Sequence, residues 1–184
     1  MKWNRAGLVG LSAAALLMVG CAATQPSARH PSSSTTSAVP LSQVCPVTPP
    51  TRDGVPVSIG PQWAEPVFGY GNLWVGAWWE IPQSLEQVRS KALGDSAYPY
   101  VTKYPTWMVK GGVVTNDGGA PQVSVKSLDG QGHGRADIGG YASASRDDGT
   151  PMHWWPTVVG FAATGCWQVT ETVGEDSIVY VVKI

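Results

Sequence analysis

Three histidines, His30, His133 and His153, are the first residues to test for chemistry in this chain. A hydrolase needs a nucleophile beside a base, and Ser145, Asp147 and His153 can be written down as a triad. A chain this rich in serine always permits such a choice, and it contains no Gly-x-Ser-x-Gly motif. A hydrolase with a cryptic site near His133 and His153 is therefore kept as an alternative, and no catalytic residue is assigned.

Metal and phosphate motifs are also missing from the sequence. Neither HExxH nor an EF-hand loop occurs, and Asp147-Asp148-Gly149 beside His153 is more simply interpreted as a solvated turn. Gly69-Tyr70-Gly71 lacks the Lys-Ser/Thr pair of a phosphate-binding loop. We therefore predict neither a metal site nor a cofactor.

Tryptophan is unusually frequent in this chain, and eight of its nine tryptophans follow residue 20. Two pairs are adjacent in sequence, and neighbouring residues of a strand point to opposite faces, so one ring of each pair can face outward. An outward ring offers a flat apolar surface to a sugar, a peptide or a partner protein. The candidate surface consists of Trp74, Trp78, Trp79, Trp154 and Trp155. The alternative is that all these rings are packed in a core.

The N-terminus has the layout of an export signal. Lys2 and Arg5 precede an apolar run, residues 6–20, that is too short to span a bilayer. The run closes in Met18-Val19-Gly20-Cys21, which resembles a bacterial lipobox and implies cleavage before Cys21 and acylation of its thiol. An ordinary secretory signal cut elsewhere is the alternative. We expect a signal peptide over residues 1–20 and a protein that is lipid-anchored to a bacterial membrane on its extracytoplasmic side.

Residues 21–44 read as the lipidated cysteine followed by a disordered tether, since Ser, Thr, Ala and Pro cannot bury enough surface to become ordered. Without Lys2 and Arg5, 10 basic residues face 13 acidic ones, and no basic run exists. Nucleic acid is therefore not an expected partner. Residues 45–184 have the size of one domain.

The cysteines agree with an exported location. Once Cys21 is lipidated, Cys45 and Cys166 are the remaining thiols, and an oxidising compartment favours their pairing. We predict a Cys45–Cys166 disulfide. Two free thiols or a metal pair are the alternative, although no CxxC or Cys/His spacing supports a metal.

The elements that must position these residues are mainly strands. Residues 165–184 predict a β-hairpin, because β-branched and aromatic residues fill two arms around the Gly, Asp and Ser of 174–177. Apolar residues on both faces of the second arm indicate a strand inside the fold, not at its edge. Shorter strands, separated by Gly and Pro turns, are predicted over 55–59, 66–68, 73–79, 106–109, 122–127 and 157–162. One helix is predicted over 84–93, capped by Ser84. This pattern favours an antiparallel β-sandwich with one short helix.

Several segments resemble a group of uncharacterised bacterial lipoproteins that carry an immunoglobulin-like domain after a Pro-rich tether. The matching segments are Tyr70-Gly71-Asn72-Leu73-Trp74-Val75, Lys103 with Trp107, Pro121 to Gly130, and Gly165-Cys166-Trp167-Gln168-Val169-Thr170. Cys45-Pro46 matches the start of the domain, and Gln168 replaces the usual Glu of the Gly-Cys-Trp-Glu-Val-Thr ending. The resemblance departs around residues 82–99. It implies an immunoglobulin-like sandwich, supports the disulfide and brings no known activity.

These observations predict a membrane-anchored, extracytoplasmic lipoprotein that acts as a non-catalytic binding or interaction module. The expected partner is an envelope protein or a cell-wall glycan, which the tryptophan surface would contact. An envelope hydrolase near His133 and His153 and a purely structural envelope lipoprotein are the alternatives.

Overall fold

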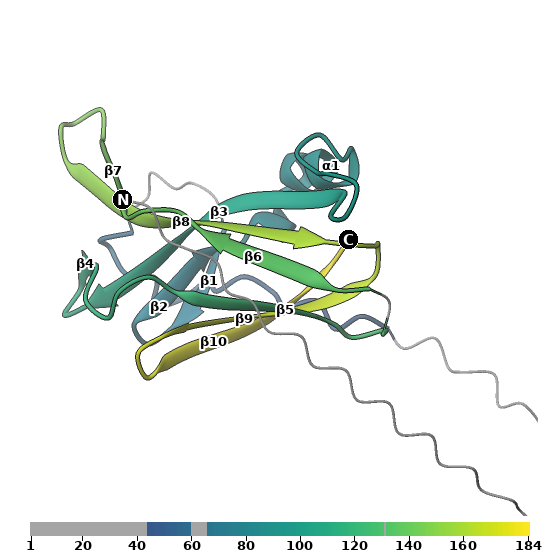
Figure 1. Ribbon diagram of the computed structural model, residues 1–184. Coiled ribbons are helices and arrows are strands. Elements are labelled where there is room, and N and C mark those ends of the chain that lie inside the picture. Colours follow the sequence, from purple (N-terminus) through teal and green to yellow (C-terminus); the bar gives the residue numbers. More distant parts are fainter. Residues whose placement is uncertain (1–43, 60–65, 131) are drawn as a thin grey trace, which may run out of the picture. The chain divides into compact units, whose positions relative to one another are not determined.

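The computed structural model describes residues 44–59, 66–130 and 132–184, and strands dominate these residues (Figure 1). The strands are β1 (Val67–Tyr70), β2 (Leu73–Gly76), β3 (Tyr100–Lys110), β4 (Val113–Thr115), β5 (Gln122–Ser127), β6 (Gly134–Ile138), β7 (Ala142–Ser145), β8 (Pro151–Phe161), β9 (Cys166–Val173) and β10 (Asp176–Lys183). A 3-10 helix, η1 (Trp78–Glu80), and one α-helix, α1 (Pro82–Arg89), follow β2. The predicted signal peptide, the lipidation site Cys21 and the tether up to residue 43 lie outside the described residues.

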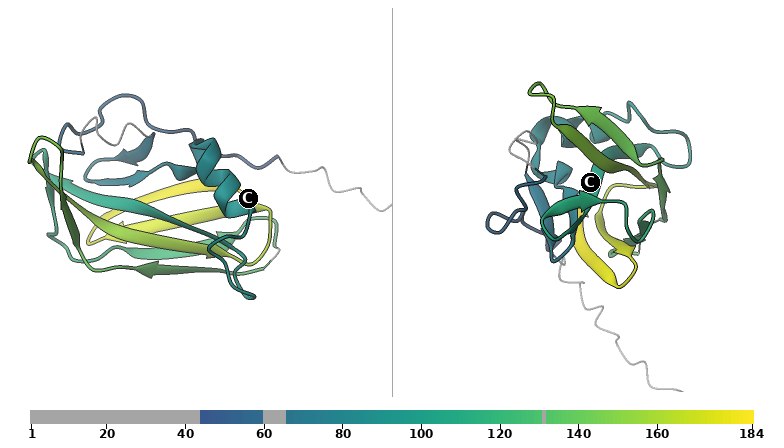
Figure 2. Two further views of the ribbon diagram at one scale, coloured as in Figure 1. Left: turned by 90° about the horizontal axis from the view of Figure 1, so that it is seen from above. Right: turned by 90° about the vertical axis from the view of Figure 1, so that its left-hand side faces the viewer.

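Two antiparallel sheets face each other across one core (Figures 1 and 2). The larger sheet has the order β1-β2-β3-β8-β6, with β4 beside β3 and β7 beside β8, and the smaller has the order β10-β9-β5. Both sheets contribute to the shared core: Leu73 and Phe161 come from the larger sheet, and Trp167 and Ile178 from the smaller. The predicted antiparallel β-sandwich with one short helix is confirmed.

The C-terminal hairpin forms as its sequence pattern requires. In β9 every second side chain is buried, from Trp167 to Val173, which is the period of a strand with one face on a core. Val173 pairs with Asp176, so the turn between the strands consists of Gly174 and Glu175. The predicted hairpin is confirmed, with its second strand beginning at Asp176.

The second arm of the hairpin, β10, lies at the edge of its sheet, so the expectation that this strand lies inside the fold is wrong. Val179 and Val181 alternate with the buried residues and point away from the core, where Val179 is 43% exposed. Thr48 covers part of this edge. Its backbone N–H donates to the Val181 carbonyl (2.9 Å), and the Val181 N–H donates to Thr48 Oγ1 (2.8 Å). Satisfied backbone groups protect an edge from pairing with another chain.

Two prolines set where the strands of the larger sheet exchange neighbours. Pro105 of β3 lies opposite Pro156 of β8, and proline has no N–H to donate to a ladder. Accordingly, β6 pairs with β8 only from Thr157 onward, and β7 pairs with β8 only up to Trp154. The N-terminal half of β8 and its partner β7 therefore form a separate hairpin at one end of the sandwich (Figure 1).

The predicted helix is present but begins earlier. Ile81 occupies the N-cap and Pro82 the first helical position, where a missing N–H has no helical partner to lose, so Ser84 is not the cap. The helix ends at Arg89, and Lys91 follows with φ 60°, a conformation typical of helix C-termini. The predicted strand over 55–59 is wrong, because these residues include a turn, and residues 78–80 form η1 instead of continuing β2.

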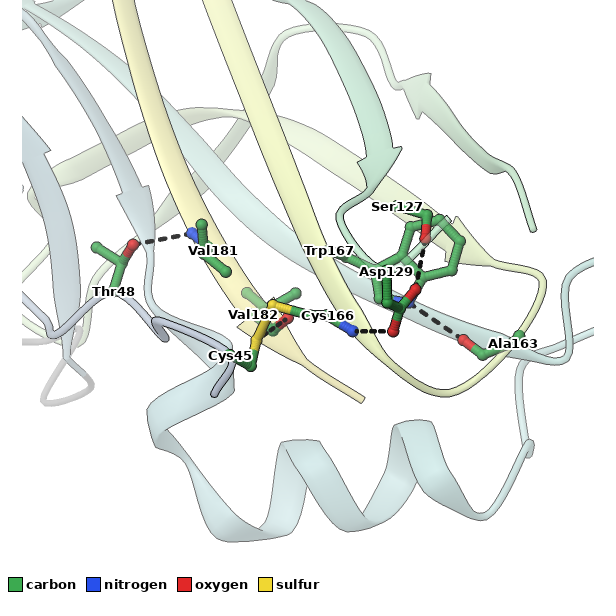
Figure 3. The surroundings of a disulfide bond; sticks show 9 residues. All are labelled: Cys45, Thr48, Ser127, Asp129, Ala163, Cys166, Trp167, Val181 and Val182. Atoms are coloured by element: carbon green, nitrogen blue, oxygen red, sulfur yellow. Dashed lines mark hydrogen bonds between the residues drawn. A yellow bond between two sulfur atoms is a disulfide. The ribbon is translucent and has the colours of Figure 1, made fainter. Parts of the chain in front are cut away.

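The predicted disulfide between Cys45 and Cys166 is confirmed (Figure 3). Cys166 is the first residue of β9, whereas Cys45 precedes β1 and belongs to neither sheet. The disulfide of an antibody domain joins two strands of the facing sheets. Here it fastens the chain entering the sandwich to the smaller sheet, and the finer immunoglobulin-like assignment stays a prediction.

The contacts beside the disulfide explain why glycine, cysteine and tryptophan occupy positions 165 to 167 (Figure 3). Asp129 Oδ2 accepts a hydrogen bond from the Cys166 N–H (3.0 Å), and Ser127 Oγ donates to Asp129 Oδ1 (2.7 Å). A Cβ at position 165 would overlap Asp129 Oδ2, and Gly165 has φ 142°, so glycine is required there. Trp167 is fully buried and its Nε1 donates to the Ala163 carbonyl (3.2 Å). Each of the three residues therefore stabilises this part of the fold: the glycine avoids an overlap, the cysteine forms the disulfide and the tryptophan fills the core.

Candidate functional site

A cavity of about 620 Å³ opens where β4 and the β7–β8 hairpin lie, at the left-hand end of the sandwich in Figure 1. Its volume falls within the range of about 300–1,000 Å³ that is typical of small-molecule sites. Three segments and one tryptophan line it: residues 57–59, residues 112–114, residues 146 and 150–153, and Trp107 of β3. The cavity therefore lies at the opposite end of the larger sheet from α1 (Figure 1).

Arg146 reaches this cavity from a tight turn. Its N–H donates to the Thr150 carbonyl (2.9 Å), and its carbonyl accepts from the Gly149 N–H (2.9 Å). Asp148 Oδ1 accepts a further bond from the Thr150 N–H (2.9 Å), and Gly149 has φ 81°, which suits glycine. The turn predicted at Asp147-Asp148-Gly149 is present, and its hydrogen bonds fix the backbone from which the Arg146 side chain extends.

Polar donors in the cavity lack acceptors. Arg146 Nε is buried, and among the described residues no atom accepts its hydrogen bond. Arg146 Nη2 makes one long bond to the Ile59 carbonyl (3.4 Å). The buried Ser58 Oγ, also in the lining, has no partner in the same described residues. Buried donors without acceptors are destabilising, so these atoms favour a ligand that accepts hydrogen bonds.

The charges of the lining also favour a ligand that accepts hydrogen bonds. The described lining residues include Arg146 and no aspartate or glutamate. Asp148 is exposed, and its pKa is lowered chiefly by hydrogen bonds from Thr150, with a smaller effect of the Arg146 charge. In the described residues no carboxylate comes within ion-pair distance of Arg146, so its charge is available to a ligand.

His153 lies on the cavity wall and is held by an aromatic neighbour. Its ring stacks on Tyr141, with 5.6 Å between the ring centroids and 9° between the planes. Tyr141 also contacts Trp155, at 5.0 Å, and partial burial raises the pKa of the Tyr141 hydroxyl. Ser143 is the ladder partner of His153, but in the described part of the chain the His153 imidazole makes no hydrogen bond to a serine hydroxyl or a carboxylate, so no nucleophile–base pair forms at this histidine there.

The two histidines of the hydrolase alternative do not form one site. His133 precedes β6, whose Gly134 pairs with Phe161 at the end of β8, and its ring contacts Tyr98. His153 lies eight residues earlier in β8, which corresponds to about 26 Å along an extended strand. These two histidines therefore lie too far apart along β8 to share one site.

Most of the predicted tryptophan surface is buried, so this prediction is corrected. Trp74, Trp78 and Trp79 are at most 4% exposed and offer no ring face to a partner. Trp78 and Trp79 lie in η1, so the alternation of a strand does not apply, and both rings join the main core. Trp79 stacks on Tyr180 (4.6 Å between centroids).

The remaining members of that surface belong to other clusters. Trp74 packs with Trp107 on the outer face of the larger sheet, and Trp154 contacts the same cluster. Trp154 and Trp155 are each half-buried and project to opposite faces of β8. These two rings alone retain exposed area among the five proposed.

A buried acid, Glu171 of β9, is the feature that the sequence analysis missed. Its carboxylate accepts hydrogen bonds from Tyr104 (2.8 Å), Tyr180 (3.0 Å) and Thr106 (2.9 Å), and Thr106 is in turn bonded to Thr157 (2.7 Å). Burial raises the pKa of Glu171 to about 6, despite the opposing effect of these hydrogen bonds. Burial also raises the pKa values of Tyr104 and Tyr180 well above their usual range. Because its partners come from both sheets, this cluster links the two layers of the sandwich.

The sequence gives only weak signals for the roles of Arg146 and Glu171. Arg146 is an isolated cation before a turn, and Glu171 occupies a core position in the alternating pattern of β9, which only a count of its parity with Trp167, Val169 and Val173 could have revealed. Within residues 44–59, 66–130 and 132–184, no group of three His, Cys, Asp or Glu side chains could hold a metal ion. The same residues contain no helix with the length and hydropathy needed to cross a membrane.

Comparison of the chain with protein-family models, with curated proteins and with solved structures finds no match.

Proposed function

We propose that this chain is a lipid-anchored, extracytoplasmic lipoprotein whose folded part binds a ligand in the cavity beside Arg146. The observation that carries the proposal is the combination of a cavity of about 620 Å³ with buried donors that have no acceptor among the described residues, Arg146 Nε and Ser58 Oγ. A ligand that accepts these hydrogen bonds would remove the destabilisation they cause. The binding module expected from the sequence is thereby moved from the tryptophan surface to this cavity.

The lipid anchor is supported by the sequence and agrees with the disulfide. The Met18-Val19-Gly20-Cys21 segment supports acylation of Cys21, and disulfides persist in compartments outside the cytoplasm. A tether between Cys21 and the described residues would let the cavity reach ligands away from the membrane surface. A purely structural lipoprotein has the same anchor, and the cavity is what distinguishes the two roles.

Site-specific photocrosslinking in the cells that produce the protein tests the binding role. A benzophenone amino acid at position 113, at the cavity, is compared with the same residue at position 179 on the outer face of β10. Both positions carry exposed valines, at 63% and 43%, so neither substitution disturbs the core. We expect a reproducible crosslinked species only from position 113. The absence of any species specific to position 113 would refute the binding role and leave the structural one.

Metabolic labelling with an alkyne fatty acid tests the anchor separately. We expect label and membrane association in the full chain, and loss of both in a Cys21→Ala variant. Label that persists in Cys21→Ala would contradict acylation at this cysteine.

A further inference from the structure

The lining of the cavity divides into a polar and an apolar part. Arg146 Nε and Ser58 Oγ supply the donors that have no acceptor among the described residues. Ser58 belongs to the turn at 57–59, and Arg146 Nη2 donates to the Ile59 carbonyl of that turn. The apolar part is larger and consists of Val57, Ile59, Trp107, Val113, Val114, Pro151 and Met152. A ligand that satisfies both parts must carry a polar acceptor next to an apolar group.

The charge of the lining specifies the acceptor. Arginine stays protonated at any physiological pH, and its planar guanidinium binds a carboxylate through two parallel hydrogen bonds. Asp147 and Asp148 on the neighbouring turn are exposed, and among the described residues neither comes within ion-pair distance of Arg146. Arg146 is the one arginine or lysine of the described lining, and a single positive charge matches one negative charge, which favours a monoanion over a phosphate monoester that carries nearly two.

We infer that the cavity binds an amphiphilic carboxylate, in which an apolar chain or side chain lies against Val113 and Met152 and the carboxylate pairs with Arg146. The inference rests on the proposed binding function and names the chemical class of its ligand. The Ser58 hydroxyl donates a further hydrogen bond to the carboxylate. Two sources share this chemistry: a free fatty acid, and the C-terminal residue of a peptide with an apolar side chain.

Titration calorimetry of the full lipidated chain in nanodiscs tests this ligand class. The probes are octanoate and acetyl-Ala-Ala-Leu with a free carboxylate, each matched by its neutral amide. Empty nanodiscs of the same lipid composition correct for partition of the probe into lipid, and the Arg146→Met variant is titrated in the same way as the wild-type chain. Arg89→Met is the control for loss of a cation, since Arg89 is exposed at the end of α1 and distant from the cavity. Thermal unfolding of each variant confirms that it remains folded.

We expect at least one of the two acids to bind and its amide to bind at least tenfold more weakly. Arg146→Met should weaken binding of the acid by about ten- to hundredfold, as expected for the loss of hydrogen bonds to a charged group, and change binding of the amide less than twofold. Arg89→Met should leave both unchanged. Octanoate as the tighter probe would indicate a fatty acid, and the tripeptide a peptide C-terminus.

Two results would overturn the inference. Neither acid binding at millimolar concentration would exclude this ligand class, and acid and amide binding equally well would remove the role of the Arg146 charge. In the second case a Val113→Trp variant, which enlarges a side chain at the cavity, should still abolish binding, so that the binding function survives while the ligand class fails. Crosslinking from position 113 tests the binding function independently of either probe.

Discussion

Replacing Glu171 by glutamine should remove a pH dependence from the stability of this protein. Burial raises the pKa of Glu171 from its usual 4.5 to about 6, so the folded state binds this proton more tightly than the unfolded state does. The protonated acid therefore stabilises the fold fully below pH 4.5, and this contribution is lost as the pH rises through 6. A rise of this size corresponds to about 2 kcal/mol of unfolding free energy.

Glutamine fits the same hydrogen bonds without ionising. Its carbonyl oxygen can accept from Tyr104 and Tyr180, as Oε1 of Glu171 does. Its amide can donate to Thr106 Oγ1, which can donate in turn to Thr157 Oγ1, because either hydroxyl of that pair can be the donor. The variant should therefore match the wild-type protein near pH 4.5 and exceed its stability by about 2 kcal/mol at pH 7.5.

Urea unfolding between pH 4.5 and 8, followed by tryptophan fluorescence, measures this difference. Glu175→Gln is the matched control, because Glu175 is an exposed residue in the turn of the same hairpin. Subtracting the control removes contributions of histidines and exposed acids that both variants share. Parallel pH profiles for the wild-type protein and Glu171→Gln would refute the reasoning, as would a variant that is less stable at every pH.

Three further predictions concern the other buried features. Replacing Cys45 and Cys166 by serine should lower the unfolding free energy by about 5 kcal/mol, measured by urea denaturation, because the bond closes a loop with a sequence separation of 121; an unchanged midpoint would contradict a stabilising bond. Gly165→Ala should destabilise by about 1–3 kcal/mol, because Cβ would overlap Asp129, whereas Gly140→Ala, where nothing lies within 4 Å, should change stability little; equal effects in thermal unfolding would refute the overlap. Trp79→Ala should cost about 3–5 kcal/mol, since it loses the stack on Tyr180 and the bond to the Thr48 carbonyl (2.8 Å), and a loss below 1 kcal/mol on urea denaturation would contradict its place in the core.

Strong local patterns were sufficient to predict part of the fold. The hairpin of β9 and β10 and the strand β5 follow from alternating side chains between clear turns, and β5 has the bounds that were expected. The Cys45–Cys166 pairing follows from the count of thiols and from the exported location that the sequence predicts.

Other elements depend on contacts that no local pattern encodes. The strand β7 is Ala-Ser-Ala-Ser, with no large apolar residue, and it exists because β8 offers it a ladder. The strand β8 passes through Pro156, and a proline inside a run argues locally against a central strand. Trp78 and Trp79 were assigned to a strand, and the turn into η1 places both rings in the core instead.

The candidate site was the least predictable feature for the same reason. Ser58, Val113 and Arg146 lie far apart in sequence, and each is unremarkable in its own segment. Only the packing of the β7–β8 hairpin beside β4 and the turn at 57–59 brings them to one cavity.

The central claim, that this cavity is where the protein binds its ligand, is tested most directly by mapping binding onto the backbone. Amide resonances of the ¹⁵N-labelled lipidated chain in nanodiscs can be followed by NMR while octanoate or the tripeptide acid is added. The account predicts shifts concentrated in residues 57–59, 112–114 and 146–153, and their disappearance in Arg146→Met. Shifts centred on any other surface, or the same shifts in Arg146→Met, would contradict it.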